Sequence, residues 1–236
     1  MLPAIESLGP IAGADLWLVD LDAPEALSWR STLSDAERER AARFVFPRDR
    51  SRYEAAHGAL RHLLARSAGR SPDAVQLTSG AFGKPSMATH EGIEFNLSHS
   101  QDAALIAIGR TPLGVDIEVL RPLDDWRSLA AAHFTRAEQA VIASRPAEAQ
   151  SIEFLRCWTR KEACLKALGL GLSLDTRAVD VRLDQPDSSS ARVETRDHGA
   201  LAVRSLTIGM RAIASIAFVA PSATPTPSDR LAEVCA

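Results

Sequence analysis

The chain has 236 residues, 46% of them hydrophobic, with 27 lysines and arginines against 30 aspartates and glutamates. This length suffices for one large domain or two small ones with a buried core. The net charge of -3 argues against non-specific nucleic-acid binding, which needs a basic surface. No secretory leader and no stretch of membrane-spanning length is present, so we expect a cytoplasmic protein without membrane or nucleic-acid partners.

Capping signals and hydrophobic alternation predict the elements of the first half. Ser34 and Glu37 have the spacing of a capping box, which predicts a helix that continues to about residue 46. A second helix is expected over residues 49–67, with Gly69 as its stop. The strands expected in this half cover residues 14–20, 95–98 and 103–108, the last two around a Ser-His-Ser turn.

The second half repeats this plan. Thr135 and Glu138 form another capping box, about a hundred residues after the first, and this echo suggests an internal duplication. A long helix is expected over residues 151–168, followed by Gly169. The strands expected here cover residues 113–119, 178–183, 201–207 and 212–219. Residues 185–190 are expected to form a loop, and the proline-rich residues 221–236 a tail.

Two short segments carry the residues with the clearest chemistry. Asp116 and Glu118 alternate in a predicted strand, so both side chains leave the same face. Glu162 and Lys166 are four apart in a predicted helix and stack one turn from each other. Three carboxylates suit Mg²⁺ bound together with a phosphate substrate. The simpler interpretation is a solvated strand face and an ordinary surface pair on a helix.

Three further segments decide between these interpretations. They are the Gly-Lys-Pro of residues 83–85, the Phe-Asn-Leu-Ser-His-Ser of residues 95–100, and the basic helix of residues 49–67. In order with GVDIE and the WxxKEAxLKAxGxGL pattern, they resemble the 4′-phosphopantetheinyl transferases of the surfactin-synthetase-activating type. The resemblance runs from about residue 43 to about residue 174. It implies transfer of the phosphopantetheine arm of coenzyme A to a serine of an apo acyl- or peptidyl-carrier protein, with release of 3′,5′-ADP.

The resemblance also implies a fold. We expect an α+β protein of two similar α/β subdomains related by a pseudo-twofold axis, with the active site at their interface. Residues 1–111 would form the subdomain for the coenzyme A nucleotide, and residues 112–220 the one that carries the metal and catalytic residues. A monomer is expected, because the two subdomains already form a pseudo-dimer.

The resemblance assigns the catalytic and metal-binding roles. Asp116, Glu118 and Glu162 would hold Mg²⁺, with Mn²⁺ as an alternative ion. Glu162 would also be the base for the carrier serine, directly or through a water molecule. Lys166 would stabilise or protonate the departing phosphate.

Coenzyme A would be bound by residues from both halves. Arg61 and His99 would contact its 3′-phosphate, with Arg48 or Arg52 assisting; the simpler role for Arg61 is that of a surface residue on an amphipathic helix. The residues that the resemblance assigns to coenzyme A are Arg48, Arg52, Arg61, Gly83, Lys84, Pro85, Ser98, His99 and Lys161. Of these, Gly83, Lys84 and Pro85 would approach the adenine, Ser98 would share a phosphate-binding turn with His99, and Lys161 would meet the diphosphate or simply be exposed.

Two other functions remain open from the residues alone. The same carboxylates could activate water in a Mg²⁺-dependent hydrolase of coenzyme A or a nucleotide, or the chain could be a non-catalytic coenzyme A-binding module. The arginines that could meet an acidic helix of a carrier protein are Arg121, Arg127, Arg136 and Arg160. Cys157 and Cys164 are expected to pack in the core without chemistry.

Overall fold

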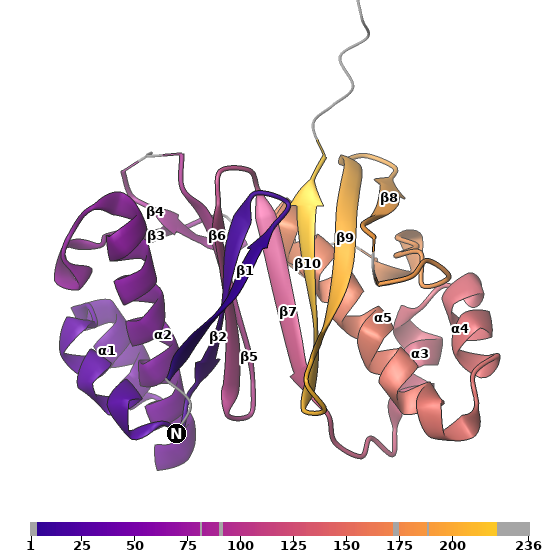
Figure 1. The fold of residues 1–236 in the computed structure, drawn as a ribbon, viewed down its shortest axis with the longest axis horizontal. Coiled ribbons are helices and arrows are strands. Elements are labelled where there is room, and N and C mark those ends of the chain that lie inside the picture. Colours follow the sequence, from indigo (N-terminus) through magenta and orange to yellow (C-terminus); the bar gives the residue numbers. More distant parts are fainter. Residues whose placement is uncertain (1–3, 81, 90–91, 172–174, 188, 221–236) are drawn as a thin grey trace, which may run out of the picture.

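The molecule has four layers, in the order helices, sheet, sheet, helices. The computed structural model describes residues 4–80, 82–89, 92–171, 175–187 and 189–220. Figure 1 shows two sheets face to face in the middle of the molecule, with the helices of each half on the outer side of its own sheet. The α+β class expected from the sequence is confirmed.

The N-terminal half, up to β6, forms a sheet with the strand order β1-β2-β6-β5 and antiparallel neighbours. Its strands are β1 (Ile5–Ile11), β2 (Ala14–Asp20), β5 (Glu94–Ser100) and β6 (Ala103–Gly109), and its helices are α1 (Asp35–Ala42) and α2 (Pro47–Ala68). The shorter elements are the 3₁₀ helices η1 (Pro24–Thr32) and η2 (Pro72–Ala74) and the hairpin of β3 (Leu77–Ser79) and β4 (Pro85–Met87).

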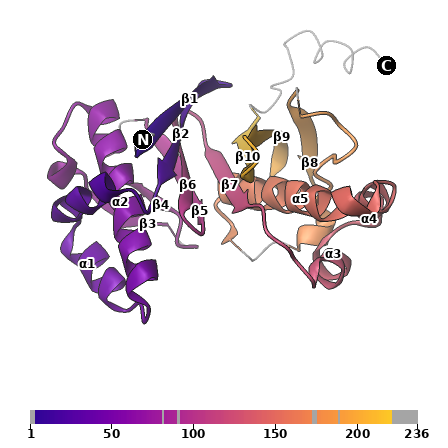
Figure 2. The ribbon, with the colours of Figure 1, turned by 60° about the horizontal axis from the view of Figure 1, so that its bottom comes forward.

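The C-terminal half, from β7 on, forms a second sheet with the order β7-β10-β9-β8, again antiparallel. Its strands are β7 (Leu113–Val119), β8 (Ala191–Thr195), β9 (Gly199–Ile208) and β10 (Ala212–Val219). Its helices are α3 (Trp126–His133), α4 (Arg136–Ala143), α5 (Ala147–Leu168) and the short 3₁₀ helix η4 (Thr176–Ala178). Figure 2 shows α5 lying along the second sheet.

Local sequence signals explain where the helices begin and end. Both predicted capping boxes are present. The side chains of Ser34 and Thr135 each accept a hydrogen bond from the N–H of the glutamate three residues on, and the carboxylate of that glutamate accepts one from the N–H of the capping residue. The two long helices, α2 and α5, have 22 residues each and end at glycines in the left-handed conformation. Helix α1 ends earlier than expected, because the extended segment before Pro47 separates it from α2.

The core follows the alternation of the strands. On β2, Trp17 and Val19 turn toward α2, whereas Leu16 turns toward the other sheet. Alternate residues of β2, β6, β7 and β10 form a cluster between the two sheets, and each sheet has a second cluster beneath its own helices. One face of each sheet is therefore covered by the other sheet, and the opposite face by the helices of its own half.

Two further predictions about elements were wrong. Residues 178–183 are not a strand: Val179, Val181 and Leu183 are buried at alternate positions, but the N–H of Val181 donates to a carboxylate of Glu138 and not to a ladder. Residues 95–98 continue as β5 to Ser100, so His99 lies in a strand and not in a turn. The sequence also gave no warning of β1, β8 or α3, because each is short or lacks a clean period.

Candidate active site

The carboxylates of β7 lie on the face of that strand that meets α5. Asp116 is only 5% exposed, and its Oδ1 is 2.6 Å from the Lys166 ammonium. Glu118 follows two positions later and is half-buried. The cluster is therefore walled by protein, which excludes the solvated strand face that would have been the simpler interpretation.

Helix α5 approaches β7 closely enough to bring its own charged pair to these acids. Gly114 makes this approach possible, because a Cβ there would lie 2.2 Å from the Ala163 carbonyl oxygen and 2.3 Å from the Ala167 nitrogen. Glu162 and Lys166 are then one turn apart at the same strand. Lys166 is thus bonded to Asp116, and Glu162 is half-buried within range of the Asp116 charge, so the two residues are not an isolated surface pair.

Serines of β5 complete the cluster from the other half of the molecule. The Ser98 hydroxyl donates to Oδ1 of Asp116 over 2.7 Å, and the Lys166 ammonium lies 3.0 Å from the same Ser98 oxygen. The Ser100 hydroxyl donates to Oε2 of Glu118, also over 2.7 Å. Residues from β5, β7 and α5 therefore meet where the two halves join.

The three acids perturb one another. Burial raises the pKa of Asp116 against the pull of Lys166, and burial also raises the pKa of Glu118. The pKa of Glu162 is raised, first by burial and then by the charge of Asp116. A group whose pKa is raised accepts a proton more readily near neutral pH, which suits a base.

The cluster fits a divalent cation in its chemistry, although its side chains are not closed around one. Within the described residues, no three His, Cys, Asp or Glu side chains are gathered tightly enough to hold a metal ion as they stand. However, Oδ2 of Asp116 is buried without a hydrogen-bond partner, and such an orphaned oxygen is costly unless a ligand meets it. A buried carboxylate oxygen beside two further carboxylates is a donor set that Mg²⁺ accepts.

A cavity of about 1180 Å³ opens in the N-terminal half. His57 and His99 both line it, and the ring of Tyr53 stacks on that of His57 at 4.1 Å. His99 is exposed along the cavity, where partial loss of hydration lowers its pKa, and the charges of His57 and Lys166 lower it further. Lys166 lowers and Asp116 raises the pKa of His99, so the acid cluster lies within electrostatic range of this part of the cavity wall.

The Gly-Lys-Pro segment is divided between the cavity and the seam, the region where β5 of the first half meets β7 and α5 of the second. Gly83, with a φ of 81°, and Pro85 line the cavity. Lys84 points elsewhere: its ammonium lies 2.9 Å from the carbonyl oxygen of Leu113 and 3.4 Å from that of Ala167. Of this segment, therefore, only Gly83 and Pro85 are placed at the cavity where the adenine contact was expected, and the Lys84 side chain instead ties the first half to β7 and to the end of α5.

Arg61 lines the cavity but uses its guanidinium within the protein. It is 2% exposed, and its NH1 lies 3.0 Å from Oε2 of Glu37. Its other nitrogens donate to three backbone carbonyl oxygens, those of Pro72, Asp73 and Val75. We therefore revise the expectation for Arg61: its charge is neutralised by Glu37, and it shapes the cavity wall. It is not a surface residue either.

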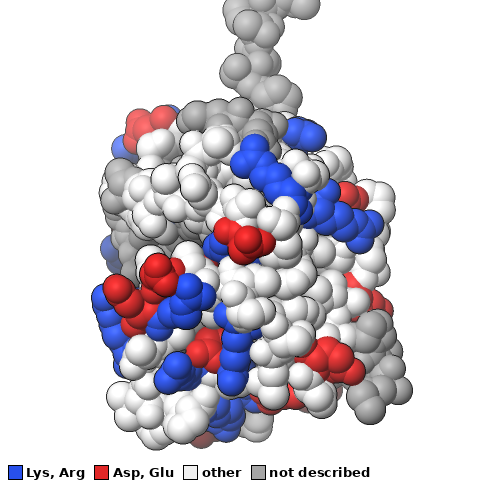
Figure 3. Space-filling view, turned by 90° about the vertical axis from the view of Figure 1, so that its left-hand side faces the viewer, with Lys and Arg blue, Asp and Glu red and all other residues white. Residues whose placement is uncertain are grey.

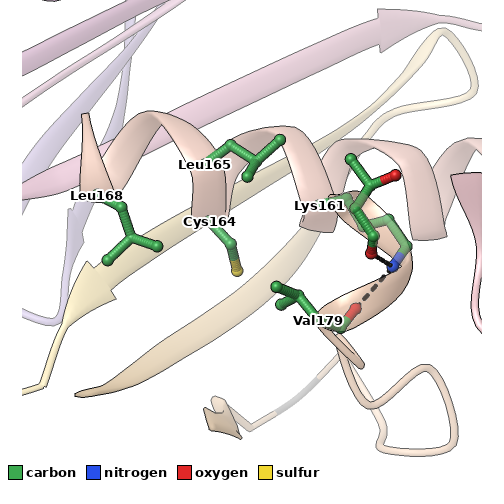
Figure 4. A pocket seen from close by; sticks show the side chains of 6 residues that line it. Lys161, Cys164, Leu165, Leu168 and Val179 are labelled. Atoms are coloured by element: carbon green, nitrogen blue, oxygen red, sulfur yellow. Dashed lines mark hydrogen bonds between the residues drawn. The ribbon is translucent and has the colours of Figure 1, made fainter. Parts of the chain in front are cut away.

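Lys161 requires a correction. It is 3% exposed, and its ammonium lies 2.9 Å from Oε2 of Glu138 and 2.7 Å from the carbonyl oxygens of Thr176 and Val179. Figure 4 shows the Lys161 side chain turned toward Val179. The small hollow that it lines together with Cys164 has no room for a water molecule. The expected contact with the coenzyme A diphosphate is wrong, because this cation is enclosed in the C-terminal half.

Arg160 is likewise unable to meet a carrier protein. It is fully buried and bonded to Ser205, to Asp187 and to backbone carbonyls beyond α5. A helical repeat locates a residue on a face, but it does not say what that face meets. Both cysteines of α5 are buried, and burial raises the pKa of Cys164 to about 12, which agrees with a core role.

The two candidate assisting arginines lie outside the cavity wall. Arg52 forms an ion pair with Asp22, whereas Arg48 has a side chain that is 73% exposed and 3.7 Å from Asp49. Figure 3 shows blue and red side chains interleaved on the face covered by the N-terminal helices, without one dominant sign. Arg40, which no sequence motif marks, is exposed and lines the cavity.

Comparison with known proteins identifies the family. The family model described as "4′-phosphopantetheinyl transferase, N-terminal" matches residues 23–110, and that of the 4′-phosphopantetheinyl transferase superfamily matches residues 112–216. The chain belongs to the 4′-phosphopantetheinyl transferase family of enzymes.

Named relatives agree with this. The transferase HetI of Nostoc sp. is 42% identical over 164 residues, which are 67% of this chain and 69% of HetI. A putative transferase of Synechocystis sp. is 34% identical over 67% of this chain and 65% of its own length. The transferase Sfp of Bacillus subtilis is 28% identical over 72% of this chain and 79% of Sfp.

Among the described residues, no helix combines the length and hydropathy needed to cross a membrane.

Proposed function

We propose that this protein transfers the 4′-phosphopantetheine group of coenzyme A to a serine hydroxyl of an apo carrier protein. One observation carries the proposal: strand β5 joins a cavity of nucleotide size to a cluster of acids. His99 faces the cavity, while its neighbours Ser98 and Ser100 hold Asp116 and Glu118. A nucleotide bound in the cavity would therefore present its diphosphate beside the acids.

The acids would share the work at the phosphorus atom. Asp116, Glu118 and Glu162 would hold Mg²⁺ or Mn²⁺, which neutralises charge on the diphosphate oxygens. The serine oxygen forms a bond to the phosphorus nearest the pantetheine, and the bond from that phosphorus to the oxygen of 3′,5′-ADP breaks. Glu162 takes the serine proton, which its raised pKa favours. The Lys166 ammonium would stabilise the departing phosphate.

The cavity would hold the nucleotide end. Gly83 and Pro85 would meet the adenine through the backbone, and His99 would contact the 3′-phosphate together with Arg40. We assign the cation role to Arg40 because its exposed side chain lines the cavity, whereas that of Arg61 is neutralised by Glu37. Arg48 and Arg52 would assist at the 3′-phosphate only after a change in the position of their side chains.

The proposal extends to organisation and location. We propose that residues 1–111 and 112–220 act as two subdomains of one monomer, since each apolar sheet face is covered within the chain. The two described cysteines are unpaired, which fits a reducing compartment such as the cytoplasm.

Intact-protein mass spectrometry tests the transfer. Apo acyl-, peptidyl- and aryl-carrier proteins, each incubated with the protein, coenzyme A and Mg²⁺, should gain the mass of one phosphopantetheine group. A carrier whose serine is replaced by alanine should gain none. Release of free phosphopantetheine without a carrier would instead show a hydrolase, and bound but unchanged coenzyme A would show a binding module.

The His99→Ala variant tests the nucleotide end. The KM for coenzyme A should rise about tenfold, the size of one lost phosphate hydrogen bond, whereas the KM for dephospho-coenzyme A should change little. His62→Ala is the matched control, because His62 lies on α2 outside the cavity lining, with a hydrogen bond to the Gly58 carbonyl and a ring contact to Trp29. Equal effects on both substrates would refute the 3′-phosphate contact.

A further inference from the structure

Strands β5 and β7 lie side by side at the seam, although they are edge strands of different sheets. The residues that meet rise together along both strands, 98 with 116 and 100 with 118, so the strands run parallel. The edge of a sheet exposes backbone N–H groups that need partners. At this edge, side chains of β5 supply partners to β7.

Two polar side chains of β5 satisfy the backbone of β7. Oδ1 of Asn96 accepts a hydrogen bond from the N–H of Val115 over 2.9 Å, and Oγ of Ser100 accepts one from the N–H of Val119 over 3.2 Å. Asn96 and Ser100 are 5% and 9% exposed. These buried bonds set the register of one strand against the other.

Ser100 has a second task. A hydroxyl oxygen that accepts a hydrogen bond from an N–H points its own O–H in another direction. The O–H of Ser100 donates a hydrogen bond to Oε2 of Glu118, over 2.7 Å, while its oxygen accepts from Val119. A glutamate has three side-chain torsions, so a bond to one oxygen restricts where the other can lie. Asp116 is held in the same way by Ser98, which leaves its Oδ2 without a partner.

We propose that Ser100 is a positioning residue, which orients the carboxylate of Glu118 for a divalent cation at the seam. The proposal rests on the proposed function, since that function supplies the cation. Ser100 is not among the residues that line the cavity, in contrast to Asn96 and His99 of the same strand. Its contribution therefore acts through Glu118 and not through the binding of coenzyme A.

Binding of Mn²⁺ to the protein with coenzyme A, measured by electron paramagnetic resonance without a carrier, tests this directly. Ser100→Ala should weaken Mn²⁺ binding about tenfold, as is usual when a ligand loses the partner that orients it. Ser100→Thr keeps the hydroxyl and should restore binding. In turnover, Ser100→Ala should raise the Mg²⁺ concentration needed for half-maximal rate and leave the KM for coenzyme A unchanged.

Thr195→Val is the matched control for stability. The Thr195 hydroxyl also donates once and accepts once, to the Gly199 carbonyl and from the His198 N–H, but on β8, away from the acids. It should lower the melting temperature as Ser100→Ala does and leave Mn²⁺ binding intact. If Ser100→Ala does not fold, Ser100→Cys, with a weaker donor of similar size, should show an intermediate loss.

The outcomes separate the two proposals. If Asp116→Asn abolishes Mn²⁺ binding while Ser100→Ala binds Mn²⁺ as the wild type does, the positioning role is overturned and the proposed function stands. If the wild type has no Mn²⁺ site that depends on Asp116, both the positioning role and the metal step of the proposed function fail.

Discussion

The two halves of the molecule use one scaffold for two purposes. In each half a strand leads to a capping box, and then to a helix of 22 residues that ends at a left-handed glycine. On β2 the positions that face the helix hold Trp17 and Val19, which join the core. On β7 they hold Asp116 and Glu118. The second half thus gives up apolar packing under part of its helix and gains an acid cluster.

The buried cations of the two halves match as well. Arg61 and Lys161 each leave the long helix, pair with the glutamate of the preceding capping box, and bond to carbonyl oxygens of the chain that follows the helix. The difference lies in what surrounds them. Glu37 borders the large cavity and is 11% exposed, whereas Glu138 is 1% exposed. We call this arrangement of a buried cation, a capping-box glutamate and backbone carbonyls a brace. The brace of Arg61 supports the wall of the large cavity, and the brace of Lys161 lies in a closed core.

Asp116→Asn should have the largest effect on transfer, because it removes a charge from the acid cluster, which the first half lacks. Loss of a charge at the reacting phosphate should lower the rate of transfer about a thousandfold. Stability should change little, since a neutral amide replaces a carboxylate whose pKa burial already raises. Transfer followed by mass spectrometry and unfolding followed by calorimetry measure the two. Asp15→Asn, at an exposed position of β2, is the control, and a variant of Asp116 that keeps its rate would remove the metal role.

Lys161→Met and Arg61→Met compare the two braces directly. Lys161→Met leaves the Glu138 charge buried without its cation and should cost about 3–5 kcal/mol of unfolding free energy. Arg61→Met should cost less, about 2 kcal/mol, because Glu37 keeps His57 and Ser34 as partners. Urea unfolding measures both, with Arg192→Met, from an exposed pair with Glu194, as control.

The same variants settle the role of Arg61 at the cavity. Arg61→Met should change the KM values for coenzyme A and for dephospho-coenzyme A by the same factor, since the guanidinium is neutralised by Glu37. A selective loss for coenzyme A would restore the 3′-phosphate contact that the sequence suggested.

Gly114→Ala should break the close approach that distinguishes β7 from β2. The added Cβ meets the backbone of α5, which cannot yield as a side chain can, so the helix must move. We expect a cost of about 1–3 kcal/mol, and a larger relative loss of kcat, because Glu162 and Lys166 move with the helix. Gly80→Ala, where the nearest atom would be 3.4 Å away, is the control. A variant with full activity would show that the helix position does not matter.

The smallest expected effect is a pH dependence specific to the first half. Burial alone would raise the pKa of Glu37, but hydrogen bonds from His57 and Ser34 and the charge of Arg61 lower it to about 2. A carboxyl group whose pKa is lower in the folded than in the unfolded protein stabilises the fold at pH values above its ordinary pKa of about 4.5. This stabilisation is lost as the pH falls toward 2. Glu37→Gln should therefore cost about 1–2 kcal/mol at pH 7, allowing for screening near the cavity.

This difference between Glu37→Gln and wild type should shrink as the pH is lowered through that range. Unfolding by urea at several pH values measures it. Glu39→Gln, on the exposed side of α1, should show no such trend. A constant difference at every pH would mean that the Glu37 carboxylate does not hold its charge against acid.

The sequence by itself determined whatever depends on neighbours along the chain. The capping boxes, the glycine stops of both long helices and the shared face of Asp116 and Glu118 follow from local geometry with periods of 3.6 and 2. The ordered motifs pointed to the family, which the comparisons bear out. The polar positions 96, 98 and 100 also alternate in an apolar strand, a signal that could have marked the seam.

Only the tertiary structure decided which partner each side chain meets. Arg61, Lys84 and Lys161 have the residue type of a phosphate contact, yet each is bonded to carboxylate or carbonyl oxygens within the chain. Residues distant in sequence make these bonds, and helical or strand spacing carries no information about them. The reason is physical: a buried cation must find compensating oxygens, and the fold supplies them before any ligand arrives.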